Sequence, residues 1–516
     1  MPEYNSKMFV ISKLPAFFLL ILLMGFHSGI SSTGKEKSQG TVASPETTAR
    51  YFPIIADDII KTVYTANGSA SIPSQDTLYY FLSKVKDANF NLVIANLTPI
   101  SPFETTDQYY ENFFSTLSKL NPSTDHAALN VIVYDARIKE ANNFQFPAII
   151  KKYYDRSEVY GIYYDEPRLR DFDRLASLRE IFKKNHARTH KAGQTLFVNL
   201  FGVNAVRDYV NYLDQWIDQG HPEVLSFDNY SVWDDQRAKK FGDGIGADWG
   251  RDFFLNLEIF RRKSIEYNMP FWTWVSVHQS WSSYSHRYYR HSTVSDLRFQ
   301  VYSSLAYGAT GILYYRFWNA PIEHNQNGWH EGEAILGYNG KVTDLFQPVA
   351  ELNKEVKAIG ALLLHLHSVG VYHSTNDFPK QDGVVPALPL EPLYTAGKES
   401  YGIKLLKWSN ESLLTKEELK DKIVLSLGNE AGLVGIFRYD ETRQYYFMLV
   451  NKDRHNSQIF HVVLDSQKCS VSGKQIVIKN VRTNMQMTTQ LNKDGEIMFN
   501  ALLRPGDGLL FVVDSK

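Results

Sequence analysis

The sequence predicts a (β/α)8 TIM barrel followed by a C-terminal all-β sandwich domain. First, short apolar runs alternate with longer amphipathic runs from Tyr51 onward. Second, eight strand-like runs precede residue 318, and eight is the number of strands in such a barrel. Third, after the helical stretch 345–364, strand-like segments follow one another without long helices between them. A doubly wound open sheet is the alternative for the first part, but no glycine-rich phosphate loop follows its first strand.

The eight barrel strands are predicted from short runs of aliphatic, β-branched and aromatic residues. They cover residues 52–56, 91–96, 130–135, 159–164, 195–200, 224–228, 270–276 and 311–317. Between them, apolar residues recur at helical spacing, which indicates helices that bury one face. Three such stripes are Leu78, Phe81, Leu82 and Val85; Phe172, Leu175, Leu178, Ile181 and Phe182; and Val206, Tyr209, Val210, Leu213, Trp216 and Ile217.

The sandwich is predicted from regularly spaced short strands that turn residues separate. These strands cover residues 401–408, 423–427, 434–439, 445–452, 458–464, 475–481, 496–499 and 508–514. We therefore expect a barrel domain over residues 49–366 and a sandwich domain over residues 367–516.

The N-terminus has the pattern of an export signal. Lys7 and Lys13 precede the apolar run 14–26, which is short for a membrane span and is followed by small residues. We expect a signal peptide over residues 1–32 and a polar linker over residues 33–48. An uncleaved N-terminal anchor is the alternative. The expectation is an exported protein, periplasmic or extracellular, with no stable membrane insertion after the signal is removed.

Composition limits the partners. The net charge of −1 provides no basic field for a nucleic acid, so no nucleic-acid partner is expected. The one cysteine, Cys469, excludes an intrachain disulfide, and its position in an apparent strand favours a buried structural thiol. His278, His324 and His330 lack the tight spacing of metal ligands, so neither a metal nor a cofactor is expected.

Two acids stand at the end of the fourth predicted strand. The apolar run 159–164 is followed by Asp165, Glu166 and Pro167, and the proline forces the chain out of regular pairing. Barrels carry their chemistry at the carboxyl ends of the strands. Acids before a proline are also ordinary turn residues.

The other strand exits carry carboxylate, amide and aromatic residues. Such a rim suits a hydroxyl-rich carbohydrate, because amides and carboxylates bind hydroxyls and aromatic faces stack on sugar rings. The predicted substrate-binding residues are Asp57, Asp58, Asn96, Asp135, Tyr164, Asp165, Asn199, Tyr230, Trp272, Trp274, His278, Tyr315 and Trp318.

Hydrolysis of a glycosidic bond needs two carboxyl groups beside one atom. We predict Glu166 as the general acid/base, because its side chain reaches further than that of Asp165. Asp165 then orients Glu166 or points into the barrel. Asp228 is predicted as the second carboxylate, with a hydroxyl ligand or an ion-pair partner of Arg137 or Arg316 as the alternative for this residue. The other contenders are Asp57, Asp58 and Glu331.

Three stretches resemble (β/α)8 glycoside hydrolases, especially bacterial family 42-like and clan A-like proteins. They are YGIYYDEP at 160–167, FQVYSSLAYGATGILYY at 299–315, and NGK at 339–341 together with the later LRPGDG at 503–508. The resemblance implies cleavage of O-glycosidic bonds in an oligo- or polysaccharide. It also implies that Glu166 is the acid/base, because the first stretch is similar to the strand-4 Asn-Glu-Pro motif, with Asp165 in place of the asparagine.

The seventh predicted strand departs from that pattern. Clan A proteins have a nucleophilic glutamate at its exit, but residues 270–278 contain none. Three explanations remain open at this point. Asp228 supplies the second carboxylate, or an N-acetyl group of the substrate acts instead, as in chitinase-like families. Otherwise the protein is a non-catalytic carbohydrate-binding protein on a barrel scaffold.

Overall fold

The structure is a computed structural model, and the residues that it describes all lie within the range Thr47–Lys516. They are residues 52–57, 63–64, 70–97, 103–121, 128–142, 144–154, 156–189, 195–203, 205–206, 208–232, 253–282, 288–319, 329–373, 421–439, 442, 444–471 and 475–515. The expected signal peptide and linker, Asp58, His324 and the expected strand 401–408 lie outside these ranges.

Eight parallel strands form the predicted barrel. They are β1 (Ile54–Ala56), β4 (Leu92–Leu97), β5 (Asn130–Asp135), β6 (Val159–Asp165), β7 (Thr195–Asn199), β8 (Leu225–Phe227), β9 (Phe271–Ser276) and β12 (Gly311–Tyr315). Their order is β7-β6-β5-β4-β1-β12-β9-β8. The ring closes where Leu200, just after β7, bridges to Phe227 of β8 and donates its N–H to the carbonyl of Ser226 at 2.8 Å. The prediction of a (β/α)8 barrel is therefore confirmed.

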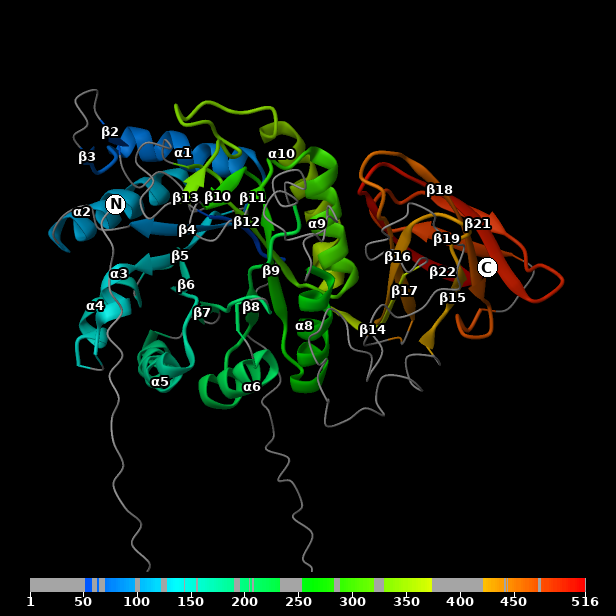
Figure 1. The fold of residues 1–516 in the computed structure, drawn as a ribbon, viewed down its shortest axis with the longest axis horizontal. Helices are drawn as coiled ribbons and strands as arrows, with labels where there is room; N and C mark the ends of the chain where they lie inside the picture. The colour runs from blue at the N-terminus through cyan, green and yellow to red at the C-terminus, as the bar shows by residue number, and fades with distance from the viewer. Residues whose placement is uncertain are drawn as a thin grey trace, which may run out of the picture. The chain divides into compact units, whose positions relative to one another are not determined.

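Helices follow the strands and pack around them (Figure 1). They are α1 (Gln75–Asp87), α2 (Phe103–Leu120), α3 (Ala136–Glu140), α4 (Phe146–Tyr154), α5 (Phe172–Thr189), α6 (Tyr209–Gly220), α8 (Phe253–Tyr267), α9 (Val294–Ala306) and α10 (Phe346–Leu363). In α1 the expected stripe is buried, and the Ser74 hydroxyl caps the first turn by accepting from the N–H of Thr77. Helix α9 begins with a reciprocal cap between Thr293 and Asp296.

Two apolar layers separate the inside of the barrel from its outside. The inner layer contains Ile55, Leu92, Ile94, Ile132, Tyr163, Phe197, Val224, Trp272, Trp274 and Leu313. The outer layer lies between strands and helices and includes Val93, Val131, Ile162, Tyr164 and Tyr314. Because successive strand residues point to opposite faces, this alternation decides which residue at each strand exit faces the barrel mouth.

Strand β6 contains an irregularity that changes this alternation. Its pairing with β5 shifts between Val159 and Gly161, which leaves Tyr160 as an extra residue. Tyr160 and Tyr163 both pack against the inner layer, although they are three residues apart. A side chain at Gly161 would have its Cβ only 2.5 Å from the Thr195 carbonyl oxygen, so glycine allows β6 and β7 to pair here.

The C-terminal part is a sandwich of two antiparallel sheets, as predicted. One sheet has the order β14-β16-β17-β22-β19-β20 and the other the order β15-β18-β21. The strands are β14 (Leu366–His373), β15 (Val424–Ser426), β16 (Gly432–Tyr439), β17 (Tyr445–Asn451), β18 (Gln458–Asp465), β19 (Ile476–Asn480), β20 (Gln486–Thr489), β21 (Glu496–Leu503) and β22 (Gly508–Ser515). Strands β14 and β20 were not predicted, and the domain boundary at 366/367 stays a prediction.

Cys469 corrects one expectation. It lies in the turn that follows β18 rather than in a strand, and it packs beside the sandwich core. Burial, followed by the charge of Asp465, raises the pKa of its thiol to about 12. The thiol is therefore protonated near neutral pH, and a nucleophilic role is disfavoured.

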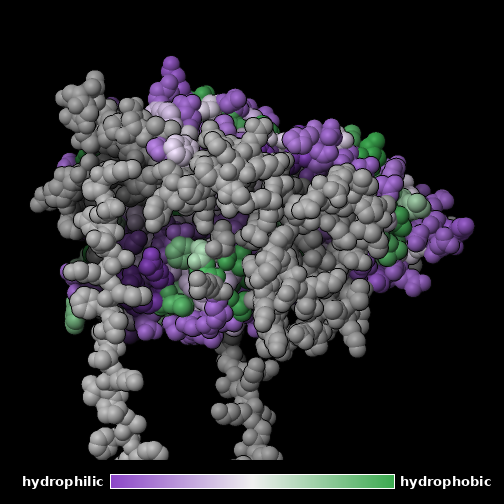
Figure 2. Space-filling model, in the orientation of Figure 1, coloured by the Kyte–Doolittle hydropathy of each residue, from purple (hydrophilic) through white to green (hydrophobic). Residues whose placement is uncertain are grey.

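Small sheets complete the described fold. β2 (Val63–Tyr64) pairs with β3 (Ala70–Ser71), and β10 (Ser280–Ser282) pairs on either side with β11 (Tyr288–Tyr289) and β13 (Trp329–Glu331). The sequence analysis missed these strands because two or three residues carry no periodicity. Figure 2 shows hydrophilic side chains over much of the described surface, with hydrophobic ones in smaller groups among them. Within the described ranges, none of the helices combines the length and the apolar character of a membrane span.

A buried charge network joins the barrel to the sandwich. Arg298 of α9 binds both Glu355 of α10, at 2.7 Å, and Asp507, which precedes β22, at 3.1 Å. Arg482 also binds Asp507, at 2.9 Å, and Glu355, at 3.0 Å. Burial by itself would raise the pKa of Asp507, but the hydrogen bonds and charge of Arg482 outweigh it and hold that pKa below its usual value. Asp507 is therefore ionised in the folded protein at neutral pH.

We expect Asp507→Ala to lower the free energy of unfolding by about 3–5 kcal/mol, because it leaves two buried guanidinium groups without this carboxylate. Urea unfolding at pH 7 measures the change. Arg504→Ala is the matched control. Its side chain is 54% exposed while it binds the same Asp507, so the expected loss is about 1 kcal/mol or less. Equal losses for the two variants would contradict the importance of burial.

Candidate active site

The alternation of the barrel strands brings several predicted site residues to the mouth. Asp165 and Asn199 end neighbouring strands in step with the inner residues Tyr163 and Phe197, and their backbones are paired across β6 and β7. Asp228 follows β8 in step with Val224. The side chains of Asp165, Asn199 and Asp228 are joined by hydrogen bonds.

One amide joins the two carboxylates. The Asn199 Nδ2 donates to Asp228 Oδ1 at 3.1 Å and to Asp165 Oδ1 at 3.3 Å. The Ser226 hydroxyl donates to Asn199 Oδ1 at 3.2 Å, and the Trp274 indole N–H donates to that hydroxyl at 3.2 Å. This chain of donors orients the amide so that its NH2 group faces both acids.

The surroundings of Asp165 favour the protonated form of its carboxyl group. Burial raises its pKa, while the hydrogen bonds from Tyr163 and Asn199 and the charges of Lys139 and Arg316 act in the opposite direction without cancelling it. The Tyr163 hydroxyl donates to Asp165 Oδ1 at 2.6 Å. Asp165 therefore keeps its proton to a higher pH than a fully solvated aspartate does.

Asp57 belongs to the same group. It follows β1 and is 5% exposed. Burial raises the pKa of Tyr163 well above its usual value, and the charges of Asp165, Asp57 and Asp228 add to this effect. Burial acts in the same way on Tyr230, with contributions from Asp228, Asp57 and Asp165. Three aspartates thus surround two protonated tyrosine hydroxyls at the mouth.

Glu166 has an unusual backbone conformation. Its φ is 44°, in the left-handed region that a non-glycine residue seldom adopts. The backbone N–H of Glu166 donates to the Asn199 carbonyl at 2.9 Å. The Tyr212 hydroxyl donates to the carbonyl of Pro167, the residue after Glu166, at 2.8 Å. The Glu166 side chain is exposed. Backbone strain of this kind is retained where the surroundings hold it, and it often marks a functional residue.

Glu166 lies within electrostatic range of the other acids. The pKa of Tyr212 is raised mainly by burial, and the charges of Glu166, Asp228 and Asp165 raise it further. Tyr212 on α6 is therefore close enough to interact electrostatically with all three carboxyl groups. The exposed Glu166 and the half-buried Asp165 and Asp228 form one side of the mouth.

Aromatic rings form another part of the mouth. Tyr230 stacks on Tyr315, with ring centroids 5.1 Å apart and an angle of 17° between the planes. Trp274 meets the edge of Tyr315 at 6.2 Å. Trp272 packs deeper in the barrel against Phe197, at 5.1 Å. Trp272 and Trp274 are buried and fill the barrel, so Tyr230 and Tyr315 are the better candidates for contact with a ligand.

A further acid, Glu331, is buried and lies where β13 ends. It accepts a hydrogen bond from the Tyr315 hydroxyl at 2.7 Å and pairs with Arg316 Nη1 at 2.7 Å. His278 follows β9 and is fully buried, with its Nε2 4.0 Å from Glu331 Oε1. Among the described residues, that Nε2 has no hydrogen-bond partner. Burial lowers the pKa of His278 to about 4, so the ring is neutral near pH 7.

Three predicted site residues do not face the mouth. Asp135 caps α3 and binds Arg137 and the Tyr153 hydroxyl on the outer face of β5. Tyr164 lies in the outer apolar layer, where Arg174 donates to its hydroxyl at 2.8 Å. Trp318 also lies in that layer, against Phe81. These three side chains therefore lie away from the residues that meet at the mouth, and a role for them in substrate binding stays a prediction.

Two further predicted residues have no described side-chain position. Asn96 lies in β4, and only its backbone is described; Asp58 is outside the described ranges. Among the described residues, no group of three or more His, Cys, Asp or Glu side chains could hold a metal ion.

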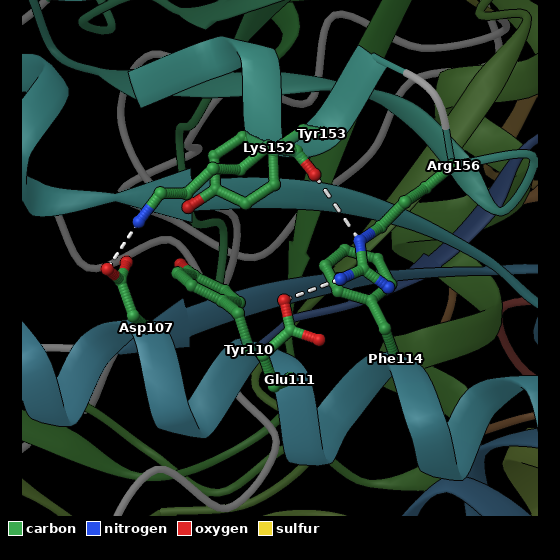
Figure 3. A pocket seen from close by; sticks show the side chains of 7 residues that line it. All are labelled: Asp107, Tyr110, Glu111, Phe114, Lys152, Tyr153 and Arg156. Carbon is green, nitrogen blue, oxygen red and sulfur yellow. Dashed lines mark hydrogen bonds and ion pairs between the residues drawn. The ribbon is translucent and has the colours of Figure 1, made fainter. Parts of the chain in front are cut away.

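A separate cavity of about 180 Å³ lies between α2 and α4 (Figure 3). Its charges pair with one another: Lys152 with Asp107, and Arg156 with Glu111 at 2.6 Å. Arg156 also lies 4.2 Å above the Phe114 ring. The cavity is smaller than typical ligand pockets of roughly 300–1,000 Å³, and it is on the outer side of the barrel helices. It is therefore not part of the candidate active site.

No family model and no curated protein matches this chain. Solved structures do resemble it. A beta-galactosidase from Marinomonas ef1 is 10% identical with a TM-score of 0.41, and the match covers 61% of this chain but only 62% of that protein. A glycoside hydrolase family 5 protein from Bacteroides vulgatus is 11% identical with a TM-score of 0.46, covering 90% of this chain and 89% of that one. A glucosidase from Croceicoccus marinus is 10% identical with a TM-score of 0.38, covering 90% and 96%. At these identities the likeness concerns the fold and assigns no activity to this chain.

We expect His278 to make stability depend on pH. The unfolded ring has a pKa near 6.5 and the folded ring a pKa of about 4, so the unfolded state binds the proton first as pH falls. The contribution of this group is therefore fully present above pH 6.5 and is lost as the pH falls from 6.5 toward 4, by at most roughly 3 kcal/mol. The difference in unfolding free energy between the wild type and His278→Asn should shrink over that window.

Chemical denaturation at several pH values measures this difference. His221→Asn is the control, because His221 is exposed in a left-handed conformation that asparagine tolerates. Parallel pH curves for the wild type and His278→Asn would contradict the assignment.

Proposed function

We propose that this protein hydrolyses O-glycosidic bonds of an oligo- or polysaccharide at the C-terminal mouth of its barrel. The observation that carries the proposal is the amide of Asn199, which holds Asp165 and Asp228 together directly beside Glu166. Glycoside hydrolysis uses carboxyl groups that differ in protonation on either side of one bond. A group of acids at the strand exits of a closed barrel provides that chemistry.

Glu166 is the proton donor in this proposal. Its side chain is exposed, so it can reach the oxygen of a bound glycoside, and its position follows from the backbone bond to Asn199. The half-buried Asp165 accepts hydrogen bonds from Tyr163 and Asn199, which hold its carboxyl group in place. Asp165 therefore positions the site rather than protonating the leaving group.

The remaining polar groups bind sugar hydroxyls. Carboxylates accept hydrogen bonds from hydroxyls, and the Asn199 amide and the protonated tyrosines supply donors. The stacked rings of Tyr230 and Tyr315 add an aromatic surface next to Asp228. A ligand rich in hydroxyl groups satisfies this mixture of donors and acceptors better than an apolar ligand does.

The second carboxylate that the sequence analysis predicted is Asp228, and it stays a candidate. Its Oδ1 shares one amide nitrogen with Asp165 Oδ1, so these two oxygens are closer than the roughly 6.5–9.5 Å that separate the acids of inverting glycosidases. Asp165 and Asp228 therefore leave little room for a water molecule between them. An inverting reaction between these two acids is disfavoured.

We expect Glu166→Gln to lower kcat by about 10²–10⁴-fold on a glycoside with a poor leaving group, because the proton for that leaving group is lost. Activated aryl glycosides need less protonation and should lose less. A screen of aryl glycosides and glycans, read by released chromophore and reducing ends, measures both. Glu351→Gln, an exposed acid on α10, is the control and should keep wild-type activity.

Two outcomes would count against the proposal. Undiminished turnover in Glu166→Gln would remove this residue from the mechanism. A glycan that raises the melting temperature of the wild type, while no product forms from any substrate, would indicate a carbohydrate-binding protein instead.

We further propose that the protein is exported. The charged residues Lys7 and Lys13 before the apolar run 14–26 support a cleavable signal. Expression of the full chain in a secreting bacterial host should give a mature protein that starts near residue 33, measured by intact mass. A full-length mass in the membrane fraction would favour an uncleaved anchor.

A further inference from the structure

We propose that Glu331 is the second catalytic carboxylate and attacks the anomeric carbon. This inference rests on the proposed glycosidase function and deepens it. The sequence analysis found no glutamate in the seventh barrel strand, which is β9. In the folded protein, a glutamate from a different part of the chain occupies the space beyond the end of that strand.

The three-stranded sheet β11-β10-β13 brings Glu331 there. β10 follows β9 after three residues and pairs antiparallel with β13, with Ser280 opposite Glu331. Glu331 therefore lies beside the segment that follows β9, although 55 positions separate it from Ser276 in the sequence. It is 7% exposed, unlike Glu333, which is exposed two residues later.

The contacts of Glu331 direct its carboxylate toward the barrel mouth. The Tyr315 hydroxyl donates to Oε1, and Arg316 pairs with Oε2, both at 2.7 Å. Tyr315 belongs to the inner face, where it packs against the inner apolar layer and stacks on Tyr230. The carboxylate is therefore fixed by residues at the end of β12 as well as by the pairing of β13 with β10.

These contacts suit a nucleophile. A carboxylate attacks only when it is ionised, and donation from a guanidinium and a hydroxyl favours the ionised form. His278, the neutral ring beside it, supplies no competing positive charge near pH 7. The His278 Nε2, fully buried and without a hydrogen-bond partner among the described residues, borders the same space. A polar ligand atom at this point would satisfy it.

Glu331 and Glu166 lie on different sides of one mouth. In the closed barrel, β6 and β9 are separated by β7 and β8. The charge of Arg316, which pairs with Glu331, also acts on Asp165, where it opposes part of the rise in pKa that burial causes. Arg316 and Asp165 are therefore close enough to interact. Asp228, by contrast, shares the Asn199 amide with Asp165 on the side of Glu166. A proton donor and a nucleophile must approach a sugar from different sides, which favours Glu331 for the second role.

The reaction then has two balanced steps. A Glu331 oxygen bonds to the anomeric carbon while the bond to the leaving oxygen breaks, and that oxygen takes the proton of Glu166. In the second step Glu166 removes a proton from water, the water oxygen bonds to the anomeric carbon, and the ester bond to Glu331 breaks. The two inversions predict net retention of the anomeric configuration.

Trapping of the ester tests the proposal. The wild-type protein is first screened with aryl glycosides, and the sugar that is hydrolysed is then used as its activated 2-deoxy-2-fluoro glycoside. The fluorine slows both formation and breakdown of the ester, and the activated leaving group speeds only its formation, so the ester accumulates. We expect a mass increase of one fluorosugar per chain, located by peptide mass spectrometry on the peptide that contains Glu331.

The outcomes separate this inference from the proposed function. An adduct on the peptide that contains Asp228, or hydrolysis of the parent glycoside with inversion, would overturn the role of Glu331 and leave a glycosidase. No hydrolysis of any glycoside by the wild type would overturn the proposed function itself.

Variants give a second, independent measurement. Glu331→Gln should lower kcat at least about 10³-fold even on activated aryl glycosides, and added azide should restore turnover and yield a glycosyl azide of inverted configuration. Glu333→Gln is the matched control, because this acid is exposed two residues away and should keep wild-type kinetics. If Glu331→Gln folds and turns over like Glu333→Gln, or if azide rescues Asp228→Asn instead, the inference is wrong.

Discussion

The structure depends on the closure of eight parallel strands into a ring, which the hydrogen bond from Leu200 to Ser226 completes. Closure gives every strand an inside and an outside. Because side chains alternate between the two faces, an acid at a strand exit either joins the mouth or packs under a helix. Asp165 and Asp228 are of the first kind, and Asp135 is of the second.

Within the mouth, hydrogen-bond donors decide what each carboxyl group can do. The amide of Asn199 lies between Asp165 and Asp228, and burial raises the pKa of Asp165. Glu331 has a guanidinium and a phenol as partners, which favour its charge. In the proposed reaction the exposed Glu166 transfers the proton and Glu331 attacks carbon, while Asp165 positions the site, so the two chemical roles fall to different carboxyl groups.

In β6, the fourth barrel strand, one extra residue decides which of the following side chains face the inside of the barrel. A regular strand that keeps Tyr160 inside would also turn Tyr164 and Glu166 inward. The extra residue in β6 reverses this order, so that Tyr163 and Asp165 point inside instead. Glu166 then follows in a left-handed conformation at the exposed edge. The two acids therefore have different surroundings, although they are adjacent in sequence.

The sequence by itself determined the element order and the fold class, because strand and helix periods are local properties that hydrophobic spacing records. It also placed carboxylate and amide residues at the strand exits, and the structure brings Asp165, Asn199 and Asp228 together there. Only the tertiary structure decided that Asp135, Tyr164 and Trp318 face outward, because the alternation assigns faces only once the register of each strand, including the extra residue in β6, is known. Only the tertiary structure brought Glu331 beside β9, because the pairing of two three-residue strands is a long-range contact without a sequence period.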